Sequence, residues 1–165
     1  MNGKVVPREE LKKICEVARK TNQHIVFTNG CLDILHVGHV RYLKQSKALG
    51  DILVVGINSD SSVRSIKGTR RPLVNEADRA EIVSSLYFVD YVSLFPEPDP
   101  LKLIQIVRPH TLVKGADWPE DQIAGAAEVK AAGGRIERIV FEHQVSTTRV
   151  IQKIQQQDAV DTSGE

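Results

Sequence analysis

Two histidines and a glycine stand together in the segment of the sequence that is richest in possible chemistry. The segment runs from Thr28 to His39, reads TNGCLDILHVGH, and contains His36 and Gly38. Histidines three residues apart converge on one side of a helix, and the first N–H groups of a helix point outward and bind phosphate. Imidazoles beside a phosphate can donate hydrogen bonds to charge that develops in a transition state. This pattern favours a catalytic phosphate loop over a pair of packed histidines or a zinc site, for which nearby ligands at the right spacing are missing.

A basic stretch supplies candidate ligands for a second anion. Residues 64–71 read RSIKGTRR, with four basic side chains and no acidic one. A charge run is usually a solvated face, but this one follows an expected strand and contains Gly68. Guanidinium groups bind phosphate oxygens in pairs. We therefore expect Lys67, Arg71 and the nearby Arg79 to bind a substrate phosphate.

Further polar clusters follow other expected strands. Gly115 permits close contact between the backbone and a base, and Asp117 can accept hydrogen bonds from sugar or ribose hydroxyls. Asp60 could bind ribose or cap a short turn, and the sequence favours neither role over the other. Trp118 could likewise contact a ligand or pack against the protein. The hydroxyls of residues 146–148, Ser-Thr-Thr, would cap the last helix and can also bind phosphate there.

These clusters need a scaffold that brings them together. Apolar periodicity predicts helices over 8–20, 37–49, 76–85, 101–107, 121–132 and 147–155, strands over 25–27, 52–57, 91–94, 111–113 and 138–141, and a loop over 58–74. Strands that alternate with helices predict a single α/β domain, with a doubly wound parallel sheet of about five strands. Ligands bind such sheets at the carboxyl ends of the strands, which is where the clusters stand.

Composition limits the possible partners. The chain has 165 residues, with 22 Lys and Arg against 21 Asp and Glu, so its formal net charge is +1. Such a chain has no overall field that attracts nucleic acid or an anionic membrane, and any anion must be bound locally. Two cysteines are too few for a disulfide framework. No apolar stretch approaches membrane length and the N-terminus lacks a signal sequence, so we expect a cytoplasmic protein.

The motif H-x-G-H after a strand, preceded by N-G-C-x-D, resembles the signature of the nucleotidyltransferase superfamily, whose members share a Rossmann-like fold. The segments VRYLKQSKALGD, VGINSD, SVRSIKGTRRPL, DRAEIVSSL, RPHTLVKGAD and VSTTRVI are similar to the adenylyltransferase domain of ADP-heptose synthases. The resemblance implies a nucleotidyltransferase domain over 24–154, an N-terminal helix and lead-in over 1–23, and a polar tail over 155–165.

The resemblance also implies a reaction, in which ATP donates its adenylyl group to D-glycero-β-D-manno-heptose 1-phosphate and pyrophosphate leaves. It implies catalytic roles for His36, His39 and Lys44. It implies contacts to the nucleotide from a larger set, namely Thr28, Asn29, Gly30, Cys31, Gly38, Asp60, Lys114, Gly115, Asp117, Ser146, Thr147 and Thr148, with Arg149 less firmly.

Partners follow from the same resemblance. Mg²⁺ would be bound mainly through the ATP phosphates, without a protein metal site. The enzyme would be a homodimer, and a separate kinase would supply the sugar phosphate because 165 residues leave no room for a fused one.

Three positions depart from the heptose pattern and leave alternatives open. Leu32 stands where Phe is common, and Ala116 and Trp118 stand within a K-G-G-D-Y pattern. A tryptophan at position 118 resembles the pattern of glycerol-3-phosphate cytidylyltransferases, which share the fold and the H-x-G-H motif. Another small nucleotidyltransferase that uses CTP, or a nucleotide-binding module without turnover, therefore stays an alternative.

Overall fold

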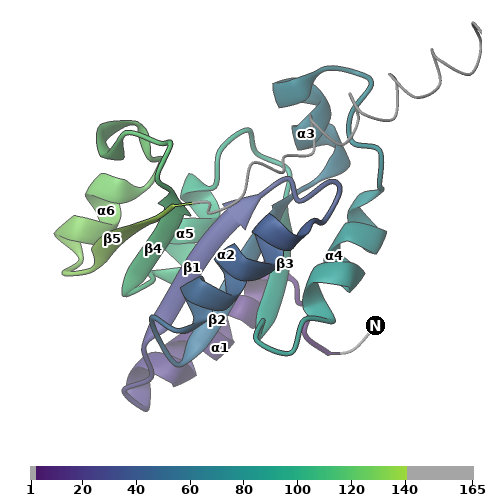
Figure 1. Ribbon diagram of the computed structural model, residues 1–165. Coiled ribbons are helices and arrows are strands. Elements are labelled where there is room, and N and C mark those ends of the chain that lie inside the picture. Colours follow the sequence, from purple (N-terminus) through teal and green to yellow (C-terminus); the bar gives the residue numbers. More distant parts are fainter. Residues whose placement is uncertain (1–2, 141–165) are drawn as a thin grey trace, which may run out of the picture.

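The computed structural model describes residues 3–140 and is built on a parallel β-sheet (Figure 1). Five strands follow the order β3-β2-β1-β4-β5, and every neighbouring pair is parallel. Their bounds are β1 Ile25–Gly30, β2 Ile52–Asn58, β3 Tyr91–Phe95, β4 Thr111–Gly115 and β5 Arg135–Ile139. The structure confirms the predicted Rossmann-like fold.

Helices cover both faces of the sheet, because successive strand residues point to opposite sides. Phe27 packs with α1 and α5 in one core cluster, whereas Val26 packs with α2 and α4 in the other (Figure 1). The helices are α1 Arg8–Lys20, α2 Val37–Lys47, α3 Asp60–Lys67, α4 Glu76–Ser84, α5 Leu101–Val107 and α6 Ala126–Ala131, with a 3₁₀ helix, η1, at Glu120–Gln122. None of the helices in residues 3–140 has the length and apolar character to cross a membrane.

The first four strands extend further toward the site than their apolar runs predict. β1 continues beyond Phe27 to Gly30, and β4 continues beyond Val113 to Gly115. Polar residues are tolerated there because the carboxyl ends of the strands open onto the site instead of the core. Asn29 and Lys114 are therefore placed by rigid strands and not by loops.

The segment 58–74, expected as a loop, contains helix α3. Ser59 begins it, since its side chain accepts a hydrogen bond from the backbone N–H of Ser62, and Gly68 ends it at φ +89°. Val63 and Ile66 are the only apolar residues of this short helix, and the Ser, Gly and Pro residues in and around it favour a loop. The prediction missed α3 for that reason.

The helix predicted over 121–132 is wrong as a single element. It is divided into η1 and α6 by Gly125, whose φ is +84°. A Cβ at Gly125 would lie 2.6 Å from Ile104 Cδ1, so close packing on α5 fixes glycine at the break.

The last strand begins earlier than the prediction of 138–141. β5 covers Arg135–Ile139 and pairs only with β4, at the edge of the sheet. An edge strand is partly exposed and alternates polar with apolar residues, so its apolar content is a weak signal. The helix predicted over 147–155 lies outside the described residues.

Candidate functional site

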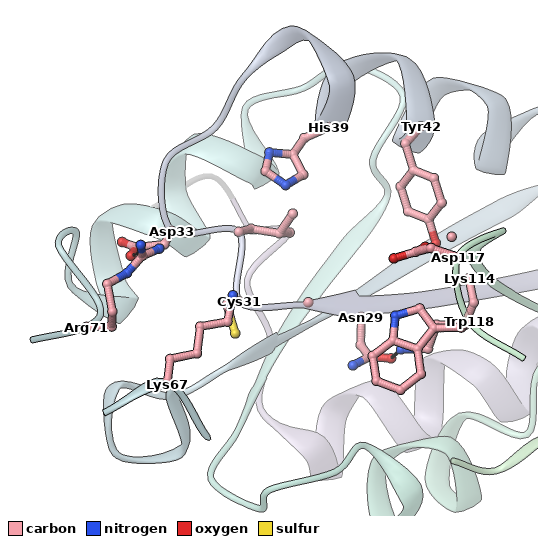
Figure 2. A pocket seen from close by; sticks show the side chains of 13 residues that line it. Asn29, Cys31, Asp33, His39, Tyr42, Lys67, Arg71, Lys114, Asp117 and Trp118 are labelled. Atoms are coloured by element: carbon pink, nitrogen blue, oxygen red, sulfur yellow. Dashed lines mark hydrogen bonds and ion pairs between the residues drawn. The ribbon is translucent and has the colours of Figure 1, made fainter. Parts of the chain in front are cut away.

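The site lies at the carboxyl edge of the sheet, where the direction of winding reverses. From β1 the chain winds to β2 and β3 on one side, whereas β4 and β5 lie on the other side. A crevice at such a switch point is the usual ligand site of an open α/β sheet. An open pocket occupies it, lined by Asn29, Gly30, Cys31, Leu32, Asp33, His39, Tyr42, Lys67, Arg71, Lys114, Gly115, Asp117 and Trp118 (Figure 2).

The two histidines stand at the start of α2. His36 has extended backbone and precedes the helix, and Gly38 is buried in its first turn. The imidazole rings of His36 and His39 stack with their centroids 3.8 Å apart. The backbone N–H of His36 donates to Nδ1 of His39 at 3.4 Å. With Nδ1 as acceptor, a neutral His39 carries its proton on Nε2.

Both histidines are held in the neutral form. Burial, followed by the electrostatic influence of His36 and Lys67, lowers the pKa of His39 to about 4. Burial also lowers the pKa of His36. Figure 2 shows the His39 ring pointing from α2 into the pocket. His39 is thus a neutral hydrogen-bond donor near pH 7, a form suited to stabilising negative charge without transferring a proton.

Tyr42 joins this wall of the pocket to the sheet. Its hydroxyl and the Thr28 hydroxyl are 2.8 Å apart in a buried hydrogen bond, and burial raises the pKa of Tyr42. Thr28, an expected nucleotide ligand, thus anchors α2 and does not line the pocket. Our sequence reasoning missed Tyr42, although its position three residues after His39 places both on one helix face.

The β1 and β4 wall of the pocket carries Asn29 and Lys114. The Lys114 ammonium donates to the Asn29 side-chain oxygen at 2.5 Å. Burial lowers the pKa of Lys114 to about 8, opposed by the charges of Cys31 and Asp117. Asp117 and Trp118 follow β4 and are exposed at the mouth of the pocket (Figure 2).

Arg71 and Asp33 form an ion pair at one end of the pocket. Arg71 Nη2 lies 2.5 Å from Asp33 Oδ2. The Asp33 carboxylate also accepts hydrogen bonds from the backbone N–H groups of Leu73 and Val74, at 2.8 and 2.9 Å. Asp33 thereby ties the loop after β1 to the loop before α4, and Lys67 lies beside this pair in the pocket lining (Figure 2).

Arg79 lies in the interior of the protein, although the sequence predicted that it binds a substrate phosphate. Its side chain is fully buried and does not line the pocket. Its three nitrogens donate to Val74 O at 2.9 Å, Cys31 O at 2.5 Å and Asp60 Oδ1 at 2.8 Å. This guanidinium therefore joins α4 to the phosphate loop and to the start of α3, and Asp60 is turned toward it.

The remaining candidates fall into three groups: outside the pocket, in its lining, or beyond the described residues. Lys44 is exposed on α2 and is not among the lining residues. Gly30, Cys31 and Gly115 line the pocket. Residues 146–149, with the predicted Ser-Thr-Thr cluster and Arg149, lie outside the described residues.

Comparison with curated proteins places this arrangement among known relatives. The chain is 46% identical over 153 residues to the bifunctional protein HldE of Syntrophotalea carbinolica, covering 93% of this chain and 31% of that protein. It is 49% identical over 151 residues to HldE of Helicobacter pylori, covering 92% and 31%. The chain therefore spans about a third of the length of these relatives.

Two solved structures share the fold. The lipopolysaccharide core biosynthesis protein from Thermoplasma volcanium matches with a TM-score of 0.63 and 34% identity, over 73% of this chain and 99% of that one. The pantoate-β-alanine ligase of Francisella tularensis, complexed with β-γ ATP and β-alanine, matches with a TM-score of 0.64. Its identity of 18%, over 85% of this chain and 67% of the ligase, supports the fold alone.

A family model agrees with both comparisons. The model described as cytidylyltransferase-like matches residues 27–153, from β1 to beyond the end of the described residues. This stretch includes the H-x-G-H histidines, the pocket and most of the sheet. The chain therefore belongs to the cytidylyltransferase-like family of nucleotidyltransferases.

Proposed function

We propose that the chain transfers the adenylyl group of ATP to D-glycero-β-D-manno-heptose 1-phosphate, giving ADP-heptose and pyrophosphate. A phosphate oxygen of the sugar attacks the α-phosphorus in line, and the bond from that phosphorus to the β-phosphate bridging oxygen breaks. The observation that carries the proposal is the neutral His39, whose Nε2–H lies at a helix start in a cation-lined pocket. The similarity of the chain to the HldE relatives supports the choice of substrates.

The triphosphate would bind at the first turn of α2. Gly38 allows close approach to the backbone, and the helix start attracts negative charge. His36 and His39 would donate hydrogen bonds to oxygens whose charge grows in the transition state. Lys44 would reach the outer phosphates from α2. A sugar phosphate is already a nucleophile, so no residue has to form a covalent intermediate.

The other substrate groups would occupy the two ends of the pocket. Gly115, which ends β4, and Asp117, which follows it, would contact the base and ribose. Lys67 and Arg71, at the other end, would bind the phosphate of the sugar. Arg79 and Asp60 would act indirectly, since their ion pair holds the backbone of the phosphate loop.

The donor set of the pocket suits a magnesium ion that arrives with the nucleotide. Asp33 already accepts from Arg71 and two backbone N–H groups, so Asp117 is the carboxylate of the described lining that is open to solvent. Residues 3–140 contain no group of three or more His, Cys, Asp or Glu side chains arranged to hold a metal. Mg²⁺ usually keeps water and phosphate ligands, and when bound it would neutralise the leaving pyrophosphate.

A cytidylyltransferase acting on glycerol 3-phosphate is the second candidate, and Trp118 at the mouth of the pocket favours it. Pyrophosphate release decides between the two when ATP or CTP is offered with heptose 1-phosphate or glycerol 3-phosphate. We expect product from ATP and heptose 1-phosphate. Product from CTP and glycerol 3-phosphate alone would favour the second candidate, and nucleotide binding without pyrophosphate would favour a module without turnover.

The proposed reaction sets the context of the chain. The sugar 1-phosphate carries its phosphoryl group on the anomeric oxygen, and we propose that a separate kinase acts upstream of this step. We also propose a cytoplasmic homodimer, and light scattering of the purified chain would measure its mass in solution.

A further inference from the structure

The pocket contains more positive charge than the described residues neutralise. Lys67, Arg71 and Lys114 line it. Arg71 is paired with Asp33, whereas no carboxylate of residues 3–140 lies within 4.0 Å of either lysine nitrogen. Lys67 is exposed to water, but Lys114 is partly buried. Lys114 is therefore the pocket cation whose charge most needs a partner.

The neighbours of Lys114 orient its ammonium without neutralising it. β1 contributes Asn29, whose neutral amide oxygen accepts the hydrogen bond. Asp117 follows β4 and favours the charged ammonium from outside ion-pair distance, and Cys31, which follows β1, acts in the same direction. Arg138 of β5 is in register with Lys114, and its exposed side chain is directed to Trp118 O at 3.5 Å. From α2, His39 and Tyr42 face the pocket as neutral groups.

The position of Lys114 identifies the phosphate it would meet. Lys114 and Asn29 stand at the carboxyl ends of β4 and β1, the strands on either side of the switch point. Under the proposed function, the outer phosphates lie on α2 and the ribose lies near Asp117. The α-phosphate joins these two groups, so it would lie between the start of α2 and the end of β4, inside the pocket that Lys114 lines next to Asp117 (Figure 2).

We propose that Lys114 binds the non-bridging oxygens of the nucleotide α-phosphate, and that Asn29 holds the ammonium in position for it. This inference rests on the proposed function for the identity of the phosphate. Lys114 would then touch the phosphoryl group that is transferred. The contact between its ammonium and the phosphate oxygens would strengthen as negative charge develops on those oxygens.

A binding experiment tests the contact without any turnover. AMP differs from adenosine only by this phosphate, so calorimetry with both ligands isolates its contribution. We expect the wild-type chain to bind AMP at least about tenfold more tightly than adenosine, and Lys114→Met to bind both alike. An unchanged preference for AMP in Lys114→Met would overturn the proposal. CMP and cytidine replace this pair if the base is cytosine.

The preference for AMP over adenosine should also depend on pH if Lys114 binds the α-phosphate. A phosphate monoester is a dianion above pH 7, because its second pKa is about 6. The ammonium loses its proton as the pH rises through about 8. The wild-type preference for AMP should therefore fall between pH 7 and 9, and Lys114→Arg should keep its residual preference over that range. An equally steep fall in Lys114→Arg would contradict the assignment.

Stability and kinetics separate a ligand contact from a structural role. Replacing a partly buried cation that lacks a counter-ion should leave the melting temperature of Lys114→Met equal to or above that of the wild type. Its kcat should fall about 10²-fold. Lys102→Met removes an exposed lysine near Glu97 as a matched control, and its kcat should be unchanged. A large loss of stability in Lys114→Met, or an effect confined to the KM of the sugar phosphate, would overturn the proposal.

The two proposals fail in different ways. If the wild-type chain releases no pyrophosphate from ATP and heptose 1-phosphate, the proposed function is wrong. The comparison of AMP with adenosine would still decide whether Lys114 binds the α-phosphate.

Discussion

The side chain of His39 is fixed in one tautomer by the backbone that precedes it. Its Nδ1 accepts from His36 N–H, which leaves Nε2 as the donor toward the pocket. With a pKa of about 4, the ring stays neutral across the physiological range. A neutral donor stabilises a developing charge without being consumed, and the wild-type turnover should show no titration of His39 between pH 6 and 8.

Substitutions at His39 test which nitrogen matters. His39→Ala should lower kcat by about 10²-fold or more with folding intact, because a transition-state donor is lost. His39→Gln places an amide N–H near the Nε2 position and should keep more turnover than His39→Asn, whose shorter amide reaches only the Nδ1 position. Steady-state kinetics with circular dichroism as a folding control measures both. Equal turnover in Gln and Asn variants would contradict the Nε2 assignment.

At the scale of elements, two ion pairs hold the phosphate loop against α3 and α4. Arg79 joins Cys31 O to Asp60, and Asp33 joins Arg71 to the backbone before α4. The Arg71–Asp33 pair and the hydrogen bond from Arg79 to Cys31 O connect the loop after β1 to segments that follow β2, so this loop is shaped by its neighbours as well as by its own sequence.

Arg79→Met should therefore destabilise the fold by about 3 kcal/mol, since it leaves the Asp60 carboxylate without its partner. Arg135→Met removes an exposed arginine whose partner is Glu137 and should change the unfolding free energy by at most about 0.5 kcal/mol. Urea unfolding of the two variants measures the difference. If Arg79→Met unfolds like the wild type but loses affinity for sugar phosphate, the internal role of Arg79 is wrong.

The glycines that flank α6, Gly125 before it and Gly133 after it, form a matched pair. Gly125 and Gly133 have nearly the same φ, +84° and +83°, but only at Gly125 would a Cβ meet another side chain, Ile104, at 2.6 Å. Alanine costs about 1 kcal/mol at either position through backbone strain. Gly125→Ala should cost a further 1 to 3 kcal/mol, roughly, from overpacking. Equal unfolding free energies for the two variants would show that α5 yields to the added methyl group.

For the whole molecule, stability should fall as the solution becomes acidic. His110 lies at the far end of β1 from the pocket, and its Nδ1 accepts the N–H of Ile25 at 2.9 Å. Burial, with the charges of His24 and Arg19, lowers the pKa of His110 in the folded state. The unfolded chain takes up a proton near its usual pKa of about 6.5 and the folded chain does not, so acidification favours unfolding.

Urea unfolding between pH 7.5 and 5.5 tests this linkage. The wild type should lose stability toward pH 5.5, with contributions from His36 and His39, whose pKa values are also lowered. His110→Asn keeps an acceptor for the Ile25 N–H and cannot titrate, so its loss should be smaller. Glu97, with a pKa lowered to about 2, acts only at more acidic pH. Identical pH profiles would exclude a contribution from His110.

The sequence by itself determined the parallel sheet and the place of the histidines. The apolar runs at 25–27, 52–57, 91–94 and 111–113 lie within four of the five strands, and His36, Gly38 and His39 do begin a helix after the first strand. Such signals are local, because burial on both faces of a sheet requires apolar residues throughout a strand. Helix α3 and the start of β5 lacked that signal, since few of their residues are buried.

Only the tertiary structure decided which cations are available to a ligand. Arg71 and Arg79 look alike in the sequence, yet one lines the pocket beside Asp33 and the other is buried against Asp60, 19 residues earlier in the chain. The structure likewise placed Lys114 beside Asn29, 85 residues away, with no carboxylate of the described residues in range. The charge that an ionic side chain offers depends on its partners and its burial, and both are set by contacts between segments distant in the sequence.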